Sequence, residues 1–262
     1  MQSSVKSEHG ETARTPVIEV RGAAKSYGSI RALDGIDFAM NPGEVHALVG
    51  DNGAGKSTLL KILSGAIKPT AGTIYMDGRR VNLDNPQDSL DLGVATVYQD
   101  LALVPVLPIP ENIFLGREPT RYGFVQRRRM VRAARDLFES LGQMNIRNIE
   151  ASVADLSGGQ RQAVALARAI HGGGRALLLD EPTAALGVRE SEAMLELIES
   201  LKTPQHAIVI VSHNLAHVFR VSDRITVLRR GVKAGTAIRE GTTTEEIVSL
   251  MTGATSASGE ER

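Results

Sequence analysis

A chain of 262 residues is long enough to bury the core of one sizeable domain, or of one domain with an inserted lobe. Its 30 lysines and arginines balance 30 aspartates and glutamates, which argues against nucleic acid as the main partner because phosphate backbones attract a basic excess. The lack of cysteine excludes disulfides and favours a reducing cytosol, and no apolar run reaches the roughly 18 residues that would cross a bilayer.

Four short apolar runs are predicted to be strands, because continuous Val, Leu, Ile and Ala content is typical of strands buried on both faces. In chain order they are EVHALVG (44–50), GVATVYQ (93–99), RALLLDE (175–181) and HAIVIVSH (206–213). Apolar residues at helical spacing predict helices at 55–66, 127–142 and 188–201. This alternation predicts an α/β fold with a mostly parallel sheet.

The two ends of the chain are predicted to be disordered tails. Residues 1–15 are polar, with no apolar stretch that would suggest a secretory signal, and residues 252–262 are small and polar. Neither segment has enough apolar surface to order itself against a core.

Each predicted strand ends in polar or glycine-rich residues: a glycine loop, Gln99, Asp180 with Glu181, and Ser212 with His213. Ligands of open α/β sheets bind beyond the carboxyl ends of the strands, so parallel strands would gather these residues along one edge. Strands that simply end where polar loops begin are the alternative, which is disfavoured because the residue types match one reaction.

The segment GDNGAGKST (50–58) fits the pattern G-x-x-x-x-G-K-[ST] between a strand and a helix, which is typical of a phosphate-binding loop. Its glycines allow backbone N–H groups to surround phosphate oxygens, and the helix N-terminus adds its dipole. Lys56 is expected to reach the β- and γ-phosphates, and Ser57 to bind Mg²⁺. The candidate nucleotide-binding residues are Gly50, Asn52, Gly53, Gly55, Lys56, Ser57 and Thr58.

Asp180 and Glu181 form an acidic pair directly after a predicted strand. Asp180 is expected to hold Mg²⁺ through water, since this ion keeps several waters and accepts few protein ligands. Glu181 is placed to orient or deprotonate an attacking water. The two carboxylates could instead cap a helix, but the phosphate loop upstream favours the catalytic interpretation.

The stretch LSGGQ (156–160) is a second candidate anion site. Ser157 is a good N-cap for the helix GQRQAVALARAI, so its hydroxyl and the amides of Gly158 and Gly159 can face an anion. Taken alone, the stretch would favour the commoner interpretation of a glycine-rich helix start.

Together these motifs resemble an ATP-binding-cassette (ABC) ATPase, the motor subunit of ABC transporters. The resemblance covers about residues 16–251. It rests on the Walker A loop at 50–58, Gln99, LSGGQ at 156–160, the Walker B run ALLLDEP at 176–182 and His213 in SHN. It implies a P-loop cassette with a mostly parallel core sheet, an N-terminal antiparallel β subdomain and an inserted α-helical subdomain at about 100–165.

The resemblance also explains why one domain carries two anion sites. In this family two cassettes pack head to tail, and each LSGGQ caps the γ-phosphate held by the Walker A loop of the other. A homodimer is therefore implied, in which the contacts to the partner's ATP come from Ser157, Gly158, Gly159 and Gln160.

Three further roles are implied by the resemblance. Tyr27 would stack on adenine, with a core tyrosine at a turn as the alternative. Gln99 would sense Mg²⁺ and the attacking water, and His213 would hold the γ-phosphate and Glu181 in line. The implied metal ligands are Ser57, Gln99 and Asp180.

One position departs from the common family pattern. In TAALG, Gly187 stands where many members have an aspartate that contacts the partner subunit. The change affects the interface and leaves Lys56, Asp180 and Glu181 in place, so ATP hydrolysis is still expected.

The segment DLALVPVLPIPENIFLGRE (100–118) corresponds to the family's groove for a coupling helix of the membrane subunit; an ordinary core-filling loop is an equally good interpretation. The arginines at 127, 128, 129, 132 and 135 are usually a solvated helix face, with contact to lipid headgroups as a lesser alternative.

The sequences of several motifs, including VYQDLALVP and SGGQRQAVALARA, are most similar to those of the ATPases of bacterial monosaccharide importers of the ribose, xylose and fructose type. This implies a peripheral ATPase at the cytoplasmic face of the inner membrane. It would work with a membrane permease and, indirectly, with a periplasmic solute-binding protein. The alternatives are a non-transport ABC ATPase and a nucleotide-gated dimerisation module; Glu181 argues against the second.

Overall fold

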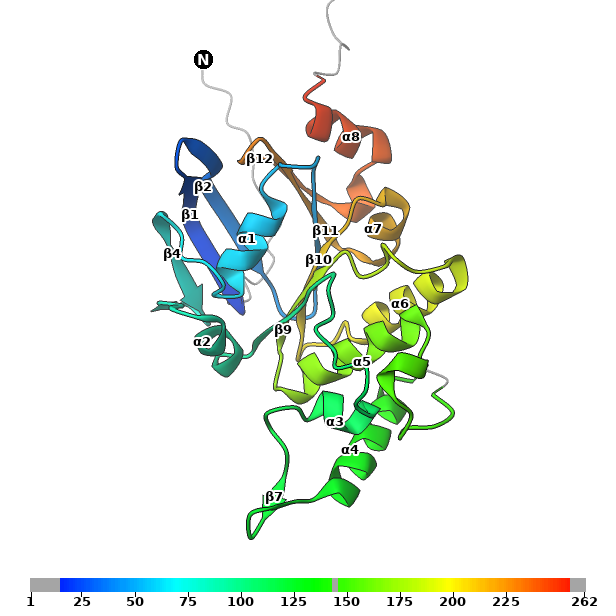
Figure 1. The fold of residues 1–262 in the computed structure, drawn as a ribbon. Coiled ribbons are helices and arrows are strands. Elements are labelled where there is room, and N and C mark those ends of the chain that lie inside the picture. Colours follow the sequence, from blue (N-terminus) through cyan, green and yellow to red (C-terminus); the bar gives the residue numbers. More distant parts are fainter. Residues whose placement is uncertain (1–14, 143–145, 255–262) are drawn as a thin grey trace, which may run out of the picture.

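The computed structural model describes residues 15–142 and 146–254, which form two large sheets, a two-stranded hairpin and the helices around them (Figure 1). Of the two predicted tails, residues 1–14 and 255–262 lie outside the described residues. Thr252 is the last residue of helix α8 (Thr244–Thr252), and Gly253 caps this helix with a φ of 74°. Helix α8 thus ends one residue beyond the predicted domain boundary at residue 251.

The core sheet has six strands in the order β12-β11-β3-β10-β9-β6. Neighbouring strands are parallel except for β11 and β12, which form an antiparallel pair. The four strands predicted from the sequence are β3, β6, β9 and β10, so the predicted α/β fold is confirmed. The bounds are β3 (Val45–Val49), β6 (Val94–Val97), β9 (Ala176–Asp180), β10 (Ala207–Val211), β11 (Arg224–Arg229) and β12 (Val232–Ile238).

A second, antiparallel sheet has the strand order β2-β1-β4-β5. It provides the antiparallel β subdomain that the family resemblance implied. Its strands are β1 (Ile18–Tyr27), β2 (Ile30–Met40), β4 (Ala71–Met76) and β5 (Arg79–Val81).

Helix α1 (Lys56–Leu63) joins the two sheets into one core. Its buried residues Leu59, Leu60, Ile62 and Leu63 pack in one cluster with residues of β1 and β2 and with one face of the core sheet. An eight-residue helix is too short to be stable alone, so burial between the sheets is what holds it.

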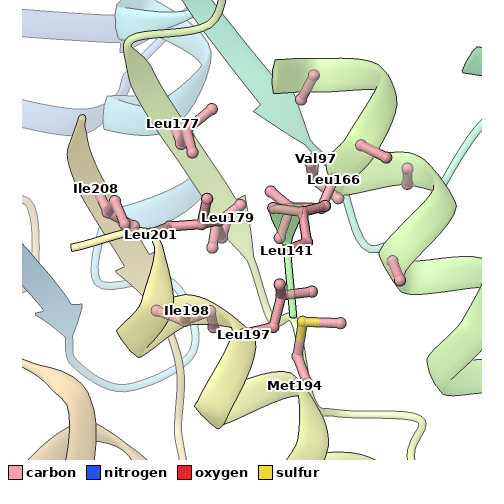
Figure 2. Close-up of a cluster of buried hydrophobic side chains, with 14 of the residues drawn as sticks. Val97, Leu141, Leu166, Leu177, Leu179, Met194, Leu197, Ile198, Leu201 and Ile208 are labelled. Carbon is pink, nitrogen blue, oxygen red and sulfur yellow. The ribbon is translucent and has the colours of Figure 1, made fainter. Parts of the chain in front are cut away.

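The other face of the core sheet is covered by α5 (Gly158–His171), α6 (Val188–Ser200) and α7 (Leu215–Val221). Figure 2 shows Leu177 and Leu179 of β9 in one buried cluster with Leu197 and Ile198 of α6. Because side chains alternate along a strand, Leu178 of β9 packs in the α1 cluster instead. Burial on both faces explains why these strands are continuously apolar.

The lobe at residues 100–165 contains α3 (Ile109–Ile113), α4 (Arg127–Ser140), the 3₁₀ turn Val153–Asp155 and the first part of α5. Met130, Ala134 and Phe138 form the buried face of α4, at the spacing that the sequence predicted. A small hairpin of β7 (Thr120–Arg121) and β8 (Phe124–Val125) precedes α4 and was not predicted. Helix α2 (Pro86–Asp91) precedes β6, and a second 3₁₀ turn covers Arg239–Gly241.

Candidate functional site

The strand order brings the four polar strand ends together, as the sequence predicted. Strand β10 lies between β3 and β9, with Val211 level with Leu48 on one side and Asp180 on the other. Strand β6 follows β9, with Val97 level with Leu179. The residues that follow these strands therefore lie along one edge of the core sheet.

The glycine loop after β3 adopts a backbone that only glycine fits easily. Gly50 has a φ of 149° and Gly55 a φ of 108°. A Cβ on Gly50 would lie 2.2 Å from the carbonyl oxygen of Leu228, and one on Gly55 would lie 2.8 Å from that of Ala32. Both glycines are therefore required by close backbone packing as well as by conformation.

Gly55 is also the N-cap of α1, and it provides no side chain to bond the first turn of the helix. The N–H groups of that turn can therefore bind an anion, which the helix dipole favours. Ser57 is exposed at this end of α1 and Thr58 is partly buried. Asn52 and Gly53 are exposed at the tip of the loop.

Lys56 folds over the loop, where Nζ donates to the carbonyl oxygens of Gly50 at 2.7 Å and Asp51 at 3.0 Å. Burial lowers the pKa of this ammonium group, while the carboxylates of Glu181, Asp51 and Asp180 oppose that shift. The charges of both acidic residues of the predicted pair therefore act on this lysine, although β10 lies between β3 and β9.

Asp180 is the last residue of β9 and is partly buried. Burial raises the pKa of its carboxyl, the neighbouring Glu181 carboxylate raises it further, and Lys56 lowers it. An added cation beside Asp180 would relieve this accumulation of buried negative charge.

Glu181 has a φ of 51°, in the left-handed region that costs a residue with a side chain about 1–3 kcal/mol. Its backbone N–H donates to the carbonyl of Val211 at 2.9 Å. Nδ1 of His213 lies 2.9 Å from the Glu181 carboxylate. The strained turn and both contacts direct this carboxylate toward the loop after β10.

Gln99 lies two residues beyond the end of β6 and is exposed. Tyr27 is the last residue of β1, with 47% of its surface exposed, and Lys25 Nζ lies 5.5 Å from the ring centroid. The alternative of a core tyrosine is therefore wrong, and the ring is accessible for stacking.

Ser157 is the N-cap of α5, as predicted. Its side-chain oxygen accepts from the N–H of Gln160, and the Gln160 side chain accepts from the N–H of Ser157 at 3.0 Å, which forms a capping box. The stretch packs against residues 186–190 and not against its own glycine loop: a Cβ on Gly159 would lie 3.1 Å from that of Glu190.

The Glu190 carboxylate lies at the start of the LSGGQ stretch and accepts hydrogen bonds there. Hydrogen bonds from the Ser157 hydroxyl and from the backbone N–H groups of Gly187 and Gly159 lower the pKa of the Glu190 carboxyl. A carboxylate of the same chain is therefore stabilised by the groups that were predicted to face a phosphate.

Sequence reasoning missed a polar network behind His213. The ring of His217 contacts Thr183 Oγ1 through Nδ1 at 3.0 Å and Asn214 Nδ2 through Nε2 at 3.3 Å. Because the amide nitrogen can only donate, Nε2 accepts and Nδ1 carries the proton. These residues line a pocket of about 310 Å³ together with Glu181 and His213. The available signal was a second histidine four residues after His213.

Comparison with protein families places the chain among known proteins. A family model described as ABC transporter matches residues 33–184. The chain is 47% identical over 236 residues to the xylose/arabinose import ATP-binding protein of Sulfolobus acidocaldarius, covering 90% of this chain and 94% of the relative. It is 44% identical over 249 residues to the fructose import ATP-binding protein of Rhizobium meliloti, covering 92% and 96%.

A third relative is the ribose import ATP-binding protein of Escherichia coli O157:H7, which is 43% identical over 91% of this chain and 47% of the relative. Among solved structures, a nucleotide-free ATP-binding cassette from an ABC transporter aligns with a TM-score of 0.76 at 22% identity, over 90% of this chain and 95% of that one. A dimeric ATP-binding cassette bound to ADP and Pi aligns with a TM-score of 0.71 at 28% identity, over 86% and 100%.

Proposed function

This chain belongs to the ABC transporter family, and we propose that it hydrolyses ATP to drive the import of a monosaccharide through a membrane permease. The support for hydrolysis is the Glu181 carboxylate, held by His213 at the strand edge that also carries the phosphate loop. The support for a sugar as the solute is the printed function of the xylose/arabinose, fructose and ribose relatives.

ATP binding would use the glycine loop and the first turn of α1. Lys56 would exchange its two bonds to loop carbonyls for bonds to the β- and γ-phosphates, which requires no change in the backbone. Tyr27 would stack on the adenine ring, for which its exposed face at the end of β1 is suited.

The donor set at the strand edge fits Mg²⁺. The Ser57 hydroxyl, the Asp180 carboxylate and the Gln99 amide are all oxygen ligands, which this ion prefers. Within residues 15–142 and 146–254 no group of three His, Cys, Asp or Glu side chains could hold a metal, so phosphate and water oxygens would complete the site. The bound ion would supply charge neutralisation at the β- and γ-phosphates.

Hydrolysis requires a water held in line with the γ-phosphorus. Glu181 would accept a hydrogen bond from this water and take its proton as the oxygen attacks and the bond to the ADP oxygen breaks. His213 would keep the carboxylate oriented and contact a γ-phosphate oxygen. The fixed backbone of Glu181 limits how far this carboxylate can turn away.

A head-to-tail homodimer would complete each site. Ser157, Gly158, Gly159 and Gln160 would cap the γ-phosphate held by the partner's glycine loop. Hydrogen bonds from Ser157 and Gly159 to the Glu190 carboxylate support their use as anion donors. Cassettes solved as dimers at 27% and 28% identity support this arrangement by similarity.

The lobe at residues 100–165 would transmit nucleotide state to the permease. The loop after Gln99 exposes 79% of Val106, while Asn112 and Arg168 hold its backbone from beneath. Leu101 and Leu103 pack partly against the core, so the core-filling interpretation fits these two residues. The docking interpretation is left for Val106. An exposed apolar residue on a fixed loop suits a docking surface.

The location that we propose is the cytoplasmic face of the membrane, with a periplasmic solute-binding protein acting indirectly through the permease. In the part of the chain that the structure describes, no helix has the length and apolar content needed to span a bilayer.

The natural absence of cysteine makes a direct test possible. A Val106→Cys variant has a single thiol, which should crosslink to a membrane permease in cells. Disruption of the gene should abolish uptake of the corresponding monosaccharide. Crosslinking to ribosome or chromosome components, with uptake unchanged, would overturn the transport function and favour a non-transport ABC ATPase.

A further inference from the structure

The hairpin between α3 and α4 has an exposed apolar tip. Thr120 pairs with Val125 and Arg121 with Phe124, and Tyr122 and Gly123 form a two-residue turn with φ values of 51° and 82°. The exposed fractions are 87% for Tyr122, 79% for Phe124 and 54% for Val125.

This tip is an ordered structure. The N–H of Gln126 donates to the carbonyl of Pro119 at 2.8 Å and closes the base of the hairpin. Arg121 stacks over the ring of Tyr122, with 5.2 Å between its guanidinium carbon and the ring centroid. Figure 1 shows the hairpin at the end of the molecule opposite α8, projecting from the lobe.

The hairpin lies in a basic stretch of the sequence. Residues 117–135 contain seven arginines and one glutamate, a net charge of plus six in a chain whose total is zero. Two of the arginines are occupied, since Arg117 donates to Gly172 and Arg127 pairs with Glu111 and Glu150. No ion pair in the described residues involves the others, which are Arg121, Arg128, Arg129, Arg132 and Arg135.

A solvated helix face and a protein-docking patch each explain only one part of the arrangement of arginines and exposed apolar side chains. A solvated helix face explains the arginines of α4 but not three adjacent exposed apolar side chains at the tip. A protein-docking patch explains the apolar tip but does not require a cationic surround. Aromatic residues that project from a cationic surface match the interface of a membrane, where rings lie among headgroups and arginines bind lipid phosphates.

We propose that the β7–β8 hairpin and the N-terminal part of α4 bind the anionic lipid surface beside the permease. Tyr122 and Phe124 enter the headgroup layer, and Arg121, Arg128 and Arg129 contact lipid phosphates. The inference rests on the proposed function for its location, because a cassette docked on a permease lies next to the inner leaflet. Charge complementarity with anionic headgroups identifies the lipid class.

Vesicle binding by the full chain tests this without the permease. The wild-type protein should bind vesicles of phosphatidylglycerol mixed with phosphatidylcholine and should not bind phosphatidylcholine alone. Arg128→Gln/Arg129→Gln should weaken binding about 25-fold, or about fivefold for each charge removed. The matched control is Arg79→Gln/Arg80→Gln, an adjacent exposed pair on β5, which should bind as the wild type does.

The chain has no tryptophan, so one introduced indole reports insertion of the tip. In Phe124→Trp the emission should shift to the blue on anionic vesicles and be quenched by brominated acyl chains. The control is Ile238→Trp, at an exposed position on β12, whose emission should not change.

Three outcomes would overturn the proposal. The first is equal binding of anionic vesicles by the two arginine double variants. The second is an emission spectrum of Phe124→Trp that does not shift on anionic vesicles. The third is an emission shift that appears only with permease in neutral lipid, or only with single-stranded nucleic acid. Sugar uptake and ATP turnover are measured separately. Failed uptake with intact vesicle binding would refute the proposed function alone, and the reverse would refute the lipid contact alone.

Discussion

The side chain of Glu181 and the ring of His213 are 2.9 Å apart although 32 residues separate them in sequence. The same glutamate also donates its backbone N–H to Val211, two residues before the histidine. Strand β10 and the loop after it therefore hold Glu181 by both backbone and side chain. The position of this carboxylate depends on β9 and β10 being neighbours in the sheet.

Replacing Glu181 with glutamine should nearly abolish ATP turnover, by roughly 10²- to 10⁴-fold, because an amide cannot take a proton from the attacking water. ATP binding should persist, since Lys56 and the glycine loop are unchanged. Phosphate release measures the rate, and analytical ultracentrifugation with MgATP should show a dimer. Equal turnover in the two proteins would remove Glu181 from the proposed catalytic role.

His213→Ala should slow hydrolysis by roughly 10²-fold with little change in ATP affinity, because Glu181 loses the group that orients it. The comparison variant is His217→Ala, which removes a ring from the same pocket but breaks contacts to Thr183 and Asn214 only. We expect its turnover to fall much less. A similar loss in both variants would mean that the pocket as a whole, and not the contact to Glu181, controls the rate.

Gly187→Asp should restore the carboxylate that many family members have at the dimer interface. The backbone accepts the change, since Gly187 has a φ of −69° and the nearest atom to an added Cβ is Glu190 Oε2 at 3.9 Å. Aspartate is also a better N-cap than glycine for α6, by a few tenths of a kcal/mol.

ATP-dependent dimerisation of Gly187→Asp should therefore be tighter than that of the wild type, with Gly187→Ala as the control for volume. If the wild type dimerises with ATP but shows no turnover, and Gly187→Asp gains turnover, the chain as it stands is a nucleotide-gated dimerisation module. Unchanged dimerisation in both variants would show that the missing carboxylate has no role at the interface.

His46 should make the protein less stable in mild acid. Burial lowers its pKa from 6.5 to about 3, and Nδ1 is held as a donor by the carbonyl of Ala39 while Nε2 accepts from Thr226. Between these two values the unfolded chain binds a proton that the folded chain does not. The free energy of unfolding is therefore unaffected above pH 6.5 and falls below it, by up to about 1.4 kcal/mol per pH unit.

Chemical denaturation between pH 4 and pH 7 measures the free energy of unfolding of the wild type and of His46→Gln, which has no titrating ring. The variant should be less stable at pH 7, and the difference from the wild type should shrink as the pH falls. Parallel loss of stability in both proteins would assign the acid sensitivity to other groups.

The strongest local signals in the sequence identified the elements that form the site. Strands β3, β6, β9 and β10 were predictable because burial on both faces demands continuous apolar residues. The glycine loop was predictable because its backbone tolerates no Cβ at Gly50 or Gly55. The helix at 127–142 was predictable from one apolar stripe, which Met130, Ala134 and Phe138 bury in α4.

The sequence alone thus determined the α/β class and the edge at which the strand ends meet, since these follow from periodicity, and the glycine loop, Asp180 and Glu181 from their motifs. The roles expected of Tyr27, Gln99, His213 and residues 157–160 came from the family resemblance. Only the tertiary structure decided the strand order β3-β10-β9-β6, the contact between Glu181 and His213, and the hairpin that exposes Tyr122. Pairing between distant segments leaves no periodic trace in either partner, and a two-residue strand is too short to show alternation.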